Sequence, residues 1–317
     1  MDSSDLPLLS LRSPLPGPPA WARPRAGDIG EADAAFSAGA ALAALDRIVA
    51  ADPAWAGCLR QRLALTAAAA AVRLIGRREE EADLRDAVLL TPAGGDPGPG
   101  GRVLRAFSLL ARRRVALDGA TVAGLAADLA IGRDAWLERL PVLAEAALHS
   151  ARATPLAAAD LVAAIQAERP EAEALAWWLA DWLVAERLNW RAGVPMLMAL
   201  RHGAAFRTTG GRGRLRPGEP GFSRAVCLAL VEGAATTVTR ANEIARRAEQ
   251  LIAVAPKVRT KGGAAVVRQL LSEDAVAAGA PGADLSRWAS RRMFDRLVAL
   301  GGVRALSDRP TLRLYGL

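Results

Sequence analysis

Histidine, cysteine and tyrosine are almost absent from this chain: its 317 residues include two histidines, two cysteines and one tyrosine. His149 and His202 have no cysteine or second histidine nearby at a metal-ligand spacing, so the sequence predicts no metal site. Cys58 and Cys227 lie far apart in apolar runs, which predicts buried free thiols rather than a disulfide. No serine or cysteine pairs with a histidine in a recognisable catalytic arrangement, so we expect neither an enzyme nor a cofactor.

Long hydrophobic runs are absent too. The longest apolar runs, at 63–72 and 174–180, are much shorter than the ~20 residues that span a bilayer. The N-terminus begins with acidic residues and reaches its sixth proline at Pro24, unlike a secretory signal. Together with the free thiols, these features predict a cytoplasmic protein that has no membrane partner, with residues 1–27 as a disordered, proline-rich arm.

Alanine dominates what is present, β-branched residues are few, and hydrophobic residues make up 52% of the chain. Because alanine has the lowest conformational cost in a helix, the composition predicts a mainly α protein. We expect a multi-helix, bundle-like body over 28–256, interrupted by a loop at 91–100 and by an irregular Gly/Arg-rich loop at 203–221. The first helix of this body is expected to bury Phe36 and Leu45.

Two features of the body invite a functional interpretation. The tryptophans at 177, 178, 182 and 190 are compatible with base stacking, but their helical spacing favours a place in the core. Asp181 and Glu186 are five residues apart and therefore point to divergent faces of one helix, which argues against a carboxylate pair. The run GGRGRLR at 210–216 is compatible with phosphate binding, but it lacks the order of a P-loop and favours a plain loop.

Positive charge is concentrated toward the C-terminus. The formal net charge of the chain is +8, and residues 257–317 hold 11 Lys and Arg against 5 Asp and Glu, a net charge of +6. Residues 201–256 add 9 Arg against 4 acids, whereas residues 1–200 hold 21 Arg against 24 acids. This asymmetry is typical of a protein that meets a polyanion with one end, although an Arg-rich composition alone would raise the total charge.

The last 61 residues, 257–317, have the pattern of a winged-helix-like module, an α-helix followed by a β-hairpin. Residues 285–300 predict one amphipathic helix, which Gly301-Gly302 ends. Strands are predicted at 303–306 and 311–315, joined by the turn SDRP. One side of the helix carries Ala289, Met293, Leu297 and Leu300, with Phe294 beside them.

Arginines occupy the other side of this helix and the hairpin. In a winged helix these positions face base edges and backbone phosphates, so the sequence predicts binding of double-stranded DNA. The candidate nucleic-acid-binding residues are Arg287, Arg291, Arg292, Arg296, Arg309 and Arg313.

Three alternatives stay open. Arg291 can pair with Asp295 at i, i+4, which would leave a plain solvated face. The module can instead dock a protein partner, with Trp288 or Phe294 as anchors. An enzyme of unrecognised type, with a site near 207–216 or at Asp181, is the third alternative.

Three stretches resemble a bacterial family catalogued as a domain of unknown function, DUF1403. They are AFSAGAALAALDRIV after WARPR, the long stretch from RLALTAAAAAVRLIGRREEE to GGDPGPGGRVL, and FDRLVALGGVRALSDRPTLRLYGL. The resemblance runs over nearly the whole chain and implies no activity, cofactor or substrate.

The tail also resembles the winged-helix ending of some Fic-type proteins and bacterial regulators, through the pattern DRL…LG…R.L…R…RLY. The HPF…GNGR signature of Fic enzymes is absent from the sequence, so the resemblance implies a fold and no AMP transfer. The pattern falls on Asp295, Arg296, Leu297, Leu300, Gly301, Arg304, Leu306, Arg309, Arg313, Leu314 and Tyr315.

Overall fold

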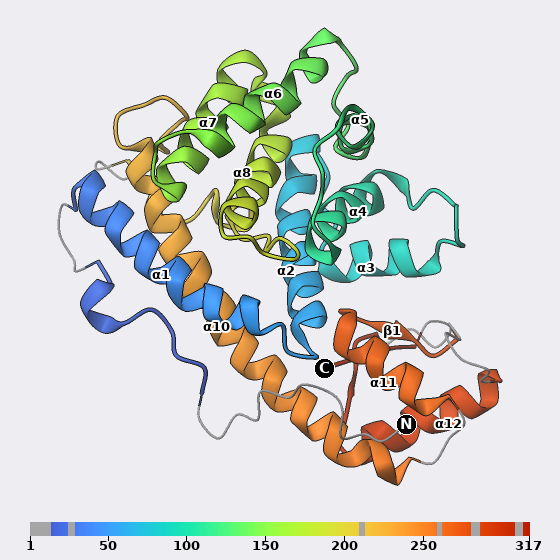
Figure 1. Ribbon diagram of the computed structural model, residues 1–317. Helices are drawn as coiled ribbons and strands as arrows, with labels where there is room; N and C mark the ends of the chain where they lie inside the picture. The colour runs from blue at the N-terminus through green and yellow to red at the C-terminus, as the bar shows by residue number, and fades with distance from the viewer. Residues whose placement is uncertain (1–13, 25–28, 209–212, 259–261, 280–285, 308–312) are drawn as a thin grey trace. The chain divides into compact units, whose positions relative to one another are not determined.

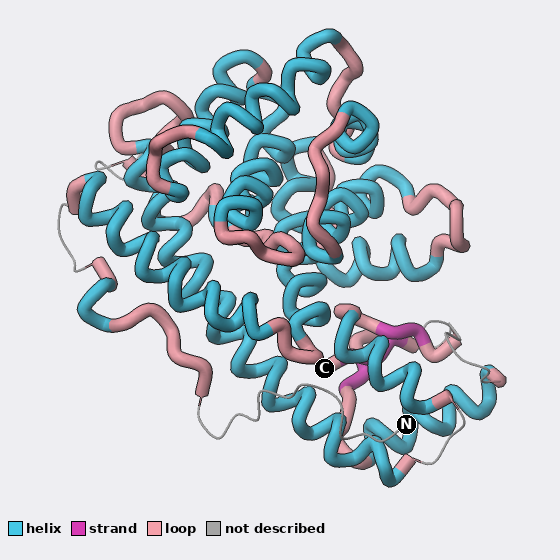
Figure 2. Tube along the Cα trace, viewed as in Figure 1, coloured by secondary structure: helices cyan, strands magenta, loops and turns pink. Residues whose placement is uncertain are grey.

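The computed structural model describes residues 14–24, 29–208, 213–258, 262–279, 286–307 and 313–317. It forms two compact units. The helical unit consists of residues 16–50 and 63–237, and the C-terminal unit of residues 1–15, 51–62 and 238–317. Figure 2 shows that helices dominate the described residues and that the strands are short. The predicted mainly α fold class is therefore confirmed.

The helical unit is built from consecutive helices joined by short connections. Its helices follow the chain (Figure 1) as α1 (Glu31–Ala51), α2 (Ala56–Ala71), α3 (Glu81–Leu90), α4 (Gly98–Arg112), α5 (Gly119–Asp128), α6 (Ala135–His149), α7 (Thr154–Glu168), α8 (Glu173–Arg187), α9 (Leu197–Leu200) and α10 (Phe222–Val254). Parts of three of these helices belong to the C-terminal unit instead. They are the last residue of α1, the first part of α2 up to Arg62 with the segment before it, and residues 238–254 of α10.

Helix α8 forms the centre of the helical unit. Every residue from 174 to 185 is buried, and α8 packs against α4, α6 and α7. The indole N–H of Trp178 donates to the carbonyl of Ala106 at 2.9 Å, and that of Trp182 donates to the carbonyl of Val115 at 2.9 Å. Because a buried indole N–H needs an acceptor, these bonds fix the register of α8 against its neighbours. The tryptophan stripe is core, as predicted.

Local capping explains where several helices begin. The Asp118 side chain accepts from the backbone N–H of Thr121 at 2.7 Å, and the Asp134 side chain accepts from that of Trp136 at 3.0 Å. Side chains of this kind satisfy donors that a helix N-terminus leaves free. These residues therefore set the first turns of α5 and α6.

Helix α1 differs from the prediction in the burial of one aromatic side chain. Leu45 is buried as expected, but Phe36 is 61% exposed, and its ring lies 6.0 Å from that of Trp21, which is 73% exposed. The prediction that Phe36 is buried was wrong, because its neighbour is another surface aromatic ring rather than the core. By length and composition α1 could cross a membrane, but half of its most apolar window is buried in the protein, as in a core helix.

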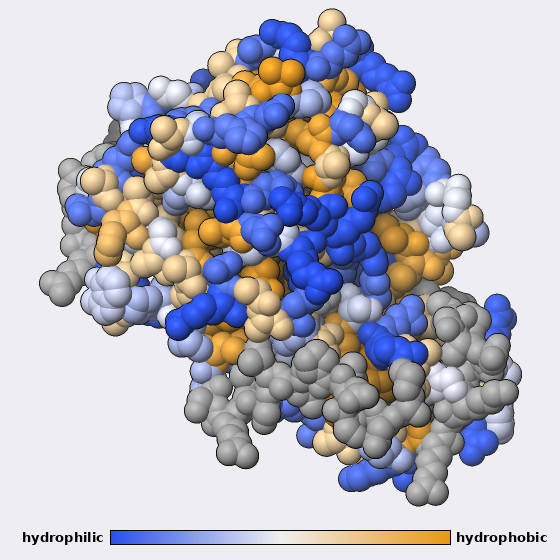
Figure 3. All heavy atoms as spheres, viewed as in Figure 1, coloured by the Kyte–Doolittle hydropathy of each residue, from blue (hydrophilic) through white to orange (hydrophobic). Residues whose placement is uncertain are grey.

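Most of the described residues in the two predicted loops form no α-helix. Helix α4 begins at Gly98, so the loop predicted at 91–100 ends three residues early. In the Gly/Arg-rich loop, Arg207 and Arg214 form an isolated antiparallel bridge, and positions 209–212 lie outside the described residues. On the face drawn in Figure 3, hydrophobic and hydrophilic residues alternate in small patches over the helical unit.

The C-terminal unit combines helices with a three-stranded antiparallel sheet. Its strands β1 (Val276–Ala277), β2 (Arg304–Ala305) and β3 (Leu314–Gly316) have the order β1-β3-β2. Tyr315 of the central strand lies opposite Val276 on one side and opposite Ala305 on the other. Strand β1 was missed by the sequence analysis, and β2 and β3 are shorter than predicted; Thr311 lies outside the described residues. The elements that follow α10 are α11 (Gly263–Ser272), β1 (Val276–Ala277), α12 (Arg287–Ala299), β2 (Arg304–Ala305) and β3 (Leu314–Gly316).

The first part of α2 belongs to this unit through close contacts. The guanidinium of Arg62 donates to Asp274 Oδ1 at 2.9 Å and to the carbonyl of Leu317 at 3.3 Å. An added Cβ at Gly57 would lie 2.8 Å from the backbone of Ser272, so glycine allows α2 to approach the end of α11. These contacts join residues 51–62 to the terminal module. The predicted boundary at 256/257 stays a prediction.

Part of the predicted arm is described. Residues 14–24 include a 3-10 turn at Ala20–Ala22. Within the C-terminal unit, the backbone N–H of Leu15 donates to Asn242 Oδ1 at 2.6 Å, and the Asn242 amide donates back to the Leu15 carbonyl at 3.3 Å. Positions 1–13 and 25–28 lie outside the described residues.

Candidate functional site

Helix α12 carries most of the predicted nucleic-acid-binding residues. It begins after Ser286, whose hydroxyl accepts from the backbone N–H of Ala289 at 3.2 Å. It ends before Gly301, whose φ of 72° is a left-handed conformation that glycine adopts without strain. The predicted helix over 285–300 is therefore confirmed to within two residues at each end.

The apolar side of α12 is fixed against the sheet. Met293, Phe294 and Leu297 are buried, and the Phe294 ring stacks on Tyr315 of β3 with centroids 4.4 Å apart and planes at 7°. The hydroxyl of Ser290 donates to the carbonyl of Ala278 at 2.7 Å. Of the predicted buried positions, Ala289 and Leu300 are only half-buried. This packing sets the rotation of α12 about its axis and therefore decides which residues face outward.

The outward side of α12 is an arginine face, which we define as Arg287, Arg291, Arg292 and Arg296. All four are exposed, and at about 100° per residue they spread over about half of the helix circumference, opposite Met293 and its buried neighbours. Within the described residues, Arg287, Arg291 and Arg296 form no ion pair with a carboxylate. Arg292 lies over the ring of Trp288, 5.0 Å from its centroid.

Asp295 is the one acidic residue in the sequence of α12. Its Oδ1 atom lies 3.5 Å from Nη1 of Arg313, so Asp295 pairs with the residue before β3 rather than with Arg291. Arg313 is therefore near the arginine face but partly neutralised. Arg309 lies outside the described residues.

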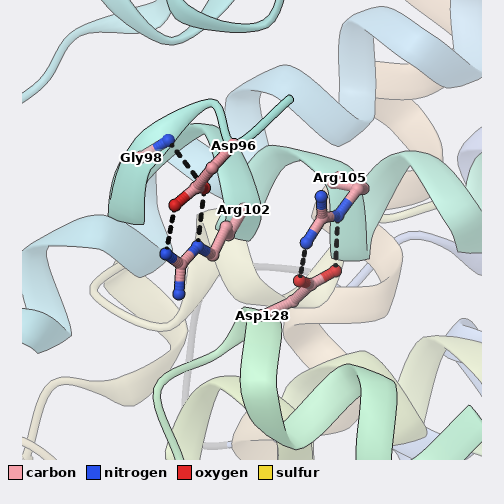
Figure 4. Close-up of polar contacts among 5 residues, drawn as sticks. All are labelled: Asp96, Gly98, Arg102, Arg105 and Asp128. Carbon is pink, nitrogen blue, oxygen red and sulfur yellow. Dashed lines mark hydrogen bonds and ion pairs between the residues drawn. The ribbon is translucent and has the colours of Figure 1, made fainter. Parts of the chain in front are cut away.

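Several exposed arginines of the helical unit are paired with carboxylates instead, and Figure 4 shows two of these pairs. Arg102 forms a bidentate pair with Asp96, and Arg105 forms one with Asp128. Hydrogen bonds from Arg102 and from the backbone N–H of Gly98 lower the pKa of Asp96 to about 2. Further arginine–carboxylate pairs of this unit are Arg114–Glu186, Arg139–Glu168, Arg152–Asp160, Arg169–Asp134 and Arg169–Glu171.

Three basic residues near the end of α12 are not among the predicted nucleic-acid-binding residues. Arg246 and Arg247 of α10 and Arg304 of β2 line a hollow of about 410 Å³ in the C-terminal unit, together with Gly301 and Gly302. Burial, followed by repulsion from Arg247 and Arg62, lowers the pKa of Arg304. The adjacent arginines at 246–247 can be recognised in the sequence, but their proximity to residues 301–304 depends on the tertiary packing.

The buried titratable groups serve the fold. Both cysteines are buried as predicted, and burial raises the pKa of the Cys58 and Cys227 thiols to about 12, so they stay protonated and unreactive. Burial also raises the pKa of Asp181 to about 8, although its carboxyl accepts hydrogen bonds from the backbone N–H groups of Met196 and Leu197. Glu186 pairs with Arg114 instead, so Asp181 has no carboxylate partner there.

Among the described residues, no group of three or more histidine, cysteine and acidic residues is arranged to hold a metal ion. What the fold and the site define is a mainly α protein with a small antiparallel sheet next to a basic helix face. The chain belongs to the family described as "Protein of unknown function (DUF1403)", whose model matches residues 7–317. No curated protein matches the chain.

Proposed function

We propose that the C-terminal unit is a winged-helix-like module that binds double-stranded DNA, and that the protein has a regulatory or other DNA-associated role. The order α11, β1, α12, β2, β3 and the sheet order β1-β3-β2 are compatible with this architecture, in which α12 takes the place of the recognition helix. The resemblance of the tail to known winged-helix endings supports the same assignment.

The arginine face of α12 is the observation that carries this proposal. A helix with its side chains is about 10–12 Å across, and the major groove of B-DNA is about 12 Å wide, so α12 has a suitable size. Its apolar side is packed against the sheet, which leaves Arg287, Arg291, Arg292 and Arg296 toward solvent. Guanidinium groups without carboxylate partners are available for phosphate oxygens and for guanine edges.

A salt titration tests the proposal. The affinity of the full chain for a fluorescently labelled 20-base-pair duplex is measured by anisotropy at several salt concentrations. Each phosphate that is neutralised contributes about 0.9 to the slope of log affinity against log salt, so four contacts predict a slope of up to about −3.6. A flat salt dependence, or no binding at low salt, would contradict the proposal.

A second candidate function is docking of a protein partner, and Trp288 favours it. This side chain is 70% exposed, and aromatic anchors next to arginine are common in protein interfaces. If docking is the function, a stoichiometric protein partner co-purifies without nucleic acid, and a Trp288→Ala substitution releases it. Under the DNA proposal, the same substitution leaves the salt slope almost unchanged, because tryptophan neutralises no phosphate.

A further inference from the structure

The hollow of about 410 Å³ at the end of α12 has a basic lining, and no acidic side chain is among the described residues that line it. Its charged lining residues are Arg246 and Arg247 of α10 and Arg304 of β2. Arg246 and Arg304 are exposed, so a ligand from solvent can reach their side chains. The volume lies within the range of about 300–1,000 Å³ that is typical of small-molecule sites. The hollow is therefore large enough for a phosphate group and a small body attached to it.

Tight packing fixes the chain around the hollow. An added Cβ at Gly302 would lie 2.5 Å from Val254 Cγ2 of α10, so glycine allows the end of α12 to approach α10 closely. Val254 and Val303 are buried. The side-chain amide of Gln250 donates to the carbonyl of Leu300 at 3.4 Å. These contacts hold α10 against the segment that joins α12 to β2.

The three arginines extend from regular secondary structure. Arg246 and Arg247 are adjacent residues of α10, and Arg304 lies in β2 opposite Gly316 of β3. The backbone at all three positions is therefore held by helix or sheet hydrogen bonds. A site of this kind does not have to order a loop before it binds a ligand, which lowers the entropic cost of binding.

Carboxylates compensate only part of the positive charge around the hollow. Arg247 pairs with Glu243 at 3.0 Å, whereas Arg246 and Arg304 form no ion pair in the part of the chain that the structure describes. Burial, and then repulsion from Arg247 and Arg62, lowers the pKa of Arg304, and attraction to Glu243 is a smaller effect. The hollow therefore has a positive potential, which a bound anion would relieve.

We propose that this hollow binds a phosphate group, to which Arg246 and Arg304 donate hydrogen bonds while Arg247 adds positive charge beside them. Guanidinium groups present their donors in a fixed fork that matches phosphate oxygens. A phosphate monoester carries nearly two negative charges and three acceptor oxygens, whereas a carboxylate has one charge and two oxygens. Phosphate is therefore the anion that can engage both unpaired guanidinium groups at once.

The phosphate has two sources with the same chemistry. One is a free sugar phosphate, and this assignment is independent of the proposed function. The other is the DNA backbone, because Gly301 and Gly302 of the hollow directly follow α12. In that case the contact rests on the proposed function and adds one phosphate to those that the arginine face binds.

Calorimetric titration of the full chain tests the site with three defined probes: 2-deoxyribose 5-phosphate, inorganic phosphate and 2-deoxyribose. At least one phosphate probe should bind about tenfold or more tightly than the neutral sugar. The double substitution Arg246→Gln and Arg304→Gln should weaken that binding about tenfold or more and leave the helix content unchanged, because both side chains are exposed. Glu243→Gln should strengthen the binding, because it removes the carboxylate that pairs with Arg247.

The matched control is the double variant Arg102→Gln and Arg105→Gln, which removes the same charge where each arginine is already paired with an aspartate. It should bind the phosphate probes like the wild type. Equal losses of phosphate binding in the two double variants would overturn the proposal.

A salt titration with the labelled duplex distinguishes the two sources. If the DNA backbone supplies the phosphate, the substitutions at Arg246 and Arg304 should reduce the slope of log affinity against log salt by about 0.9, the contribution of one phosphate. An unchanged slope together with binding of a phosphate probe assigns the site to a free phosphate. An unchanged slope without binding of either phosphate probe would overturn the proposal. If the chain binds a phosphate probe but no duplex, the DNA proposal fails and the phosphate site stands.

Discussion

Removal of two arginines from α12 should change the salt dependence of DNA binding by an amount that the structure sets. The variant combines Arg287→Gln with Arg291→Gln. These residues lie one turn apart on the arginine face, and neither forms an ion pair within the described residues. Glutamine is a good helix former, so we expect the helix and its buried side to remain intact.

The expected magnitude follows from counterion release. With four phosphate contacts the wild type has a slope of about −3.6, and loss of two contacts reduces it to about −1.8. Between about 50 and 200 mM salt, the wild type should lose affinity about 150-fold and the variant only about 12-fold. Anisotropy titrations at four salt concentrations resolve this difference, and circular dichroism checks the helix content.

The helical unit provides a control with the same change in charge. Arg102 and Arg105 are three residues apart and exposed on α4, but each is paired with an aspartate. The double variant Arg102→Gln and Arg105→Gln should keep the wild-type slope, because these guanidinium groups are already neutralised. If the two double variants have the same slope of log affinity against log salt, the claim that unpaired arginines of α12 bind phosphates is refuted.

Four further substitutions have directional outcomes. Asp295→Asn removes the one acid of α12 and should raise DNA affinity at low salt in the anisotropy assay, whereas lower affinity would exclude a phosphate-facing position. Phe294→Ala should lower the free energy of unfolding by about 3–5 kcal/mol, because it leaves a cavity between α12 and the sheet. Urea unfolding measures this change, and a decrease of less than about 1 kcal/mol would contradict the packing. Gly57→Ala places a Cβ against the backbone of Ser272 and should lower the free energy of unfolding by about 1–3 kcal/mol in the same assay. Folding raises the pKa of Asp181 to about 8, so the folded chain holds a proton that the unfolded chain releases above about pH 4. The free energy of unfolding should therefore fall as the pH rises from about 4 to about 8. Asp181→Asn should flatten this dependence in unfolding curves at pH 5 and pH 8.

The sequence was sufficient for α12, because its signals are local. Gly301 marks the end of this helix, and the apolar spacing of Met293 and Leu297 marks its buried side. A cap or a helical stripe requires only neighbours within about one turn, so no knowledge of the tertiary structure is needed.

Features that depend on distant partners could not be derived in this way. Strand β1 has two residues, too few for an alternating pattern, and it exists because β3 pairs with it. Phe36 has the spacing of a buried residue, yet its neighbour is the exposed ring of Trp21. The hollow in the C-terminal unit brings Arg246 and Arg247 of α10 next to residues 301–304, a proximity that no local pattern encodes.

In a chain with 41 basic residues, the partners of each arginine are more informative than the number of arginines. Arg187 illustrates a structural use: its guanidinium donates to the carbonyls of Ala147, Leu148 and Ser150 and so completes the end of α6. The arginine face is different, because no described carboxylate or carbonyl group binds its guanidinium groups. A side chain that contributes no internal bond is free to bind an external anion. The DNA proposal therefore rests on the partners of the α12 arginines and not on the net charge of the chain, and this is why the paired arginines Arg102 and Arg105 are its proper control.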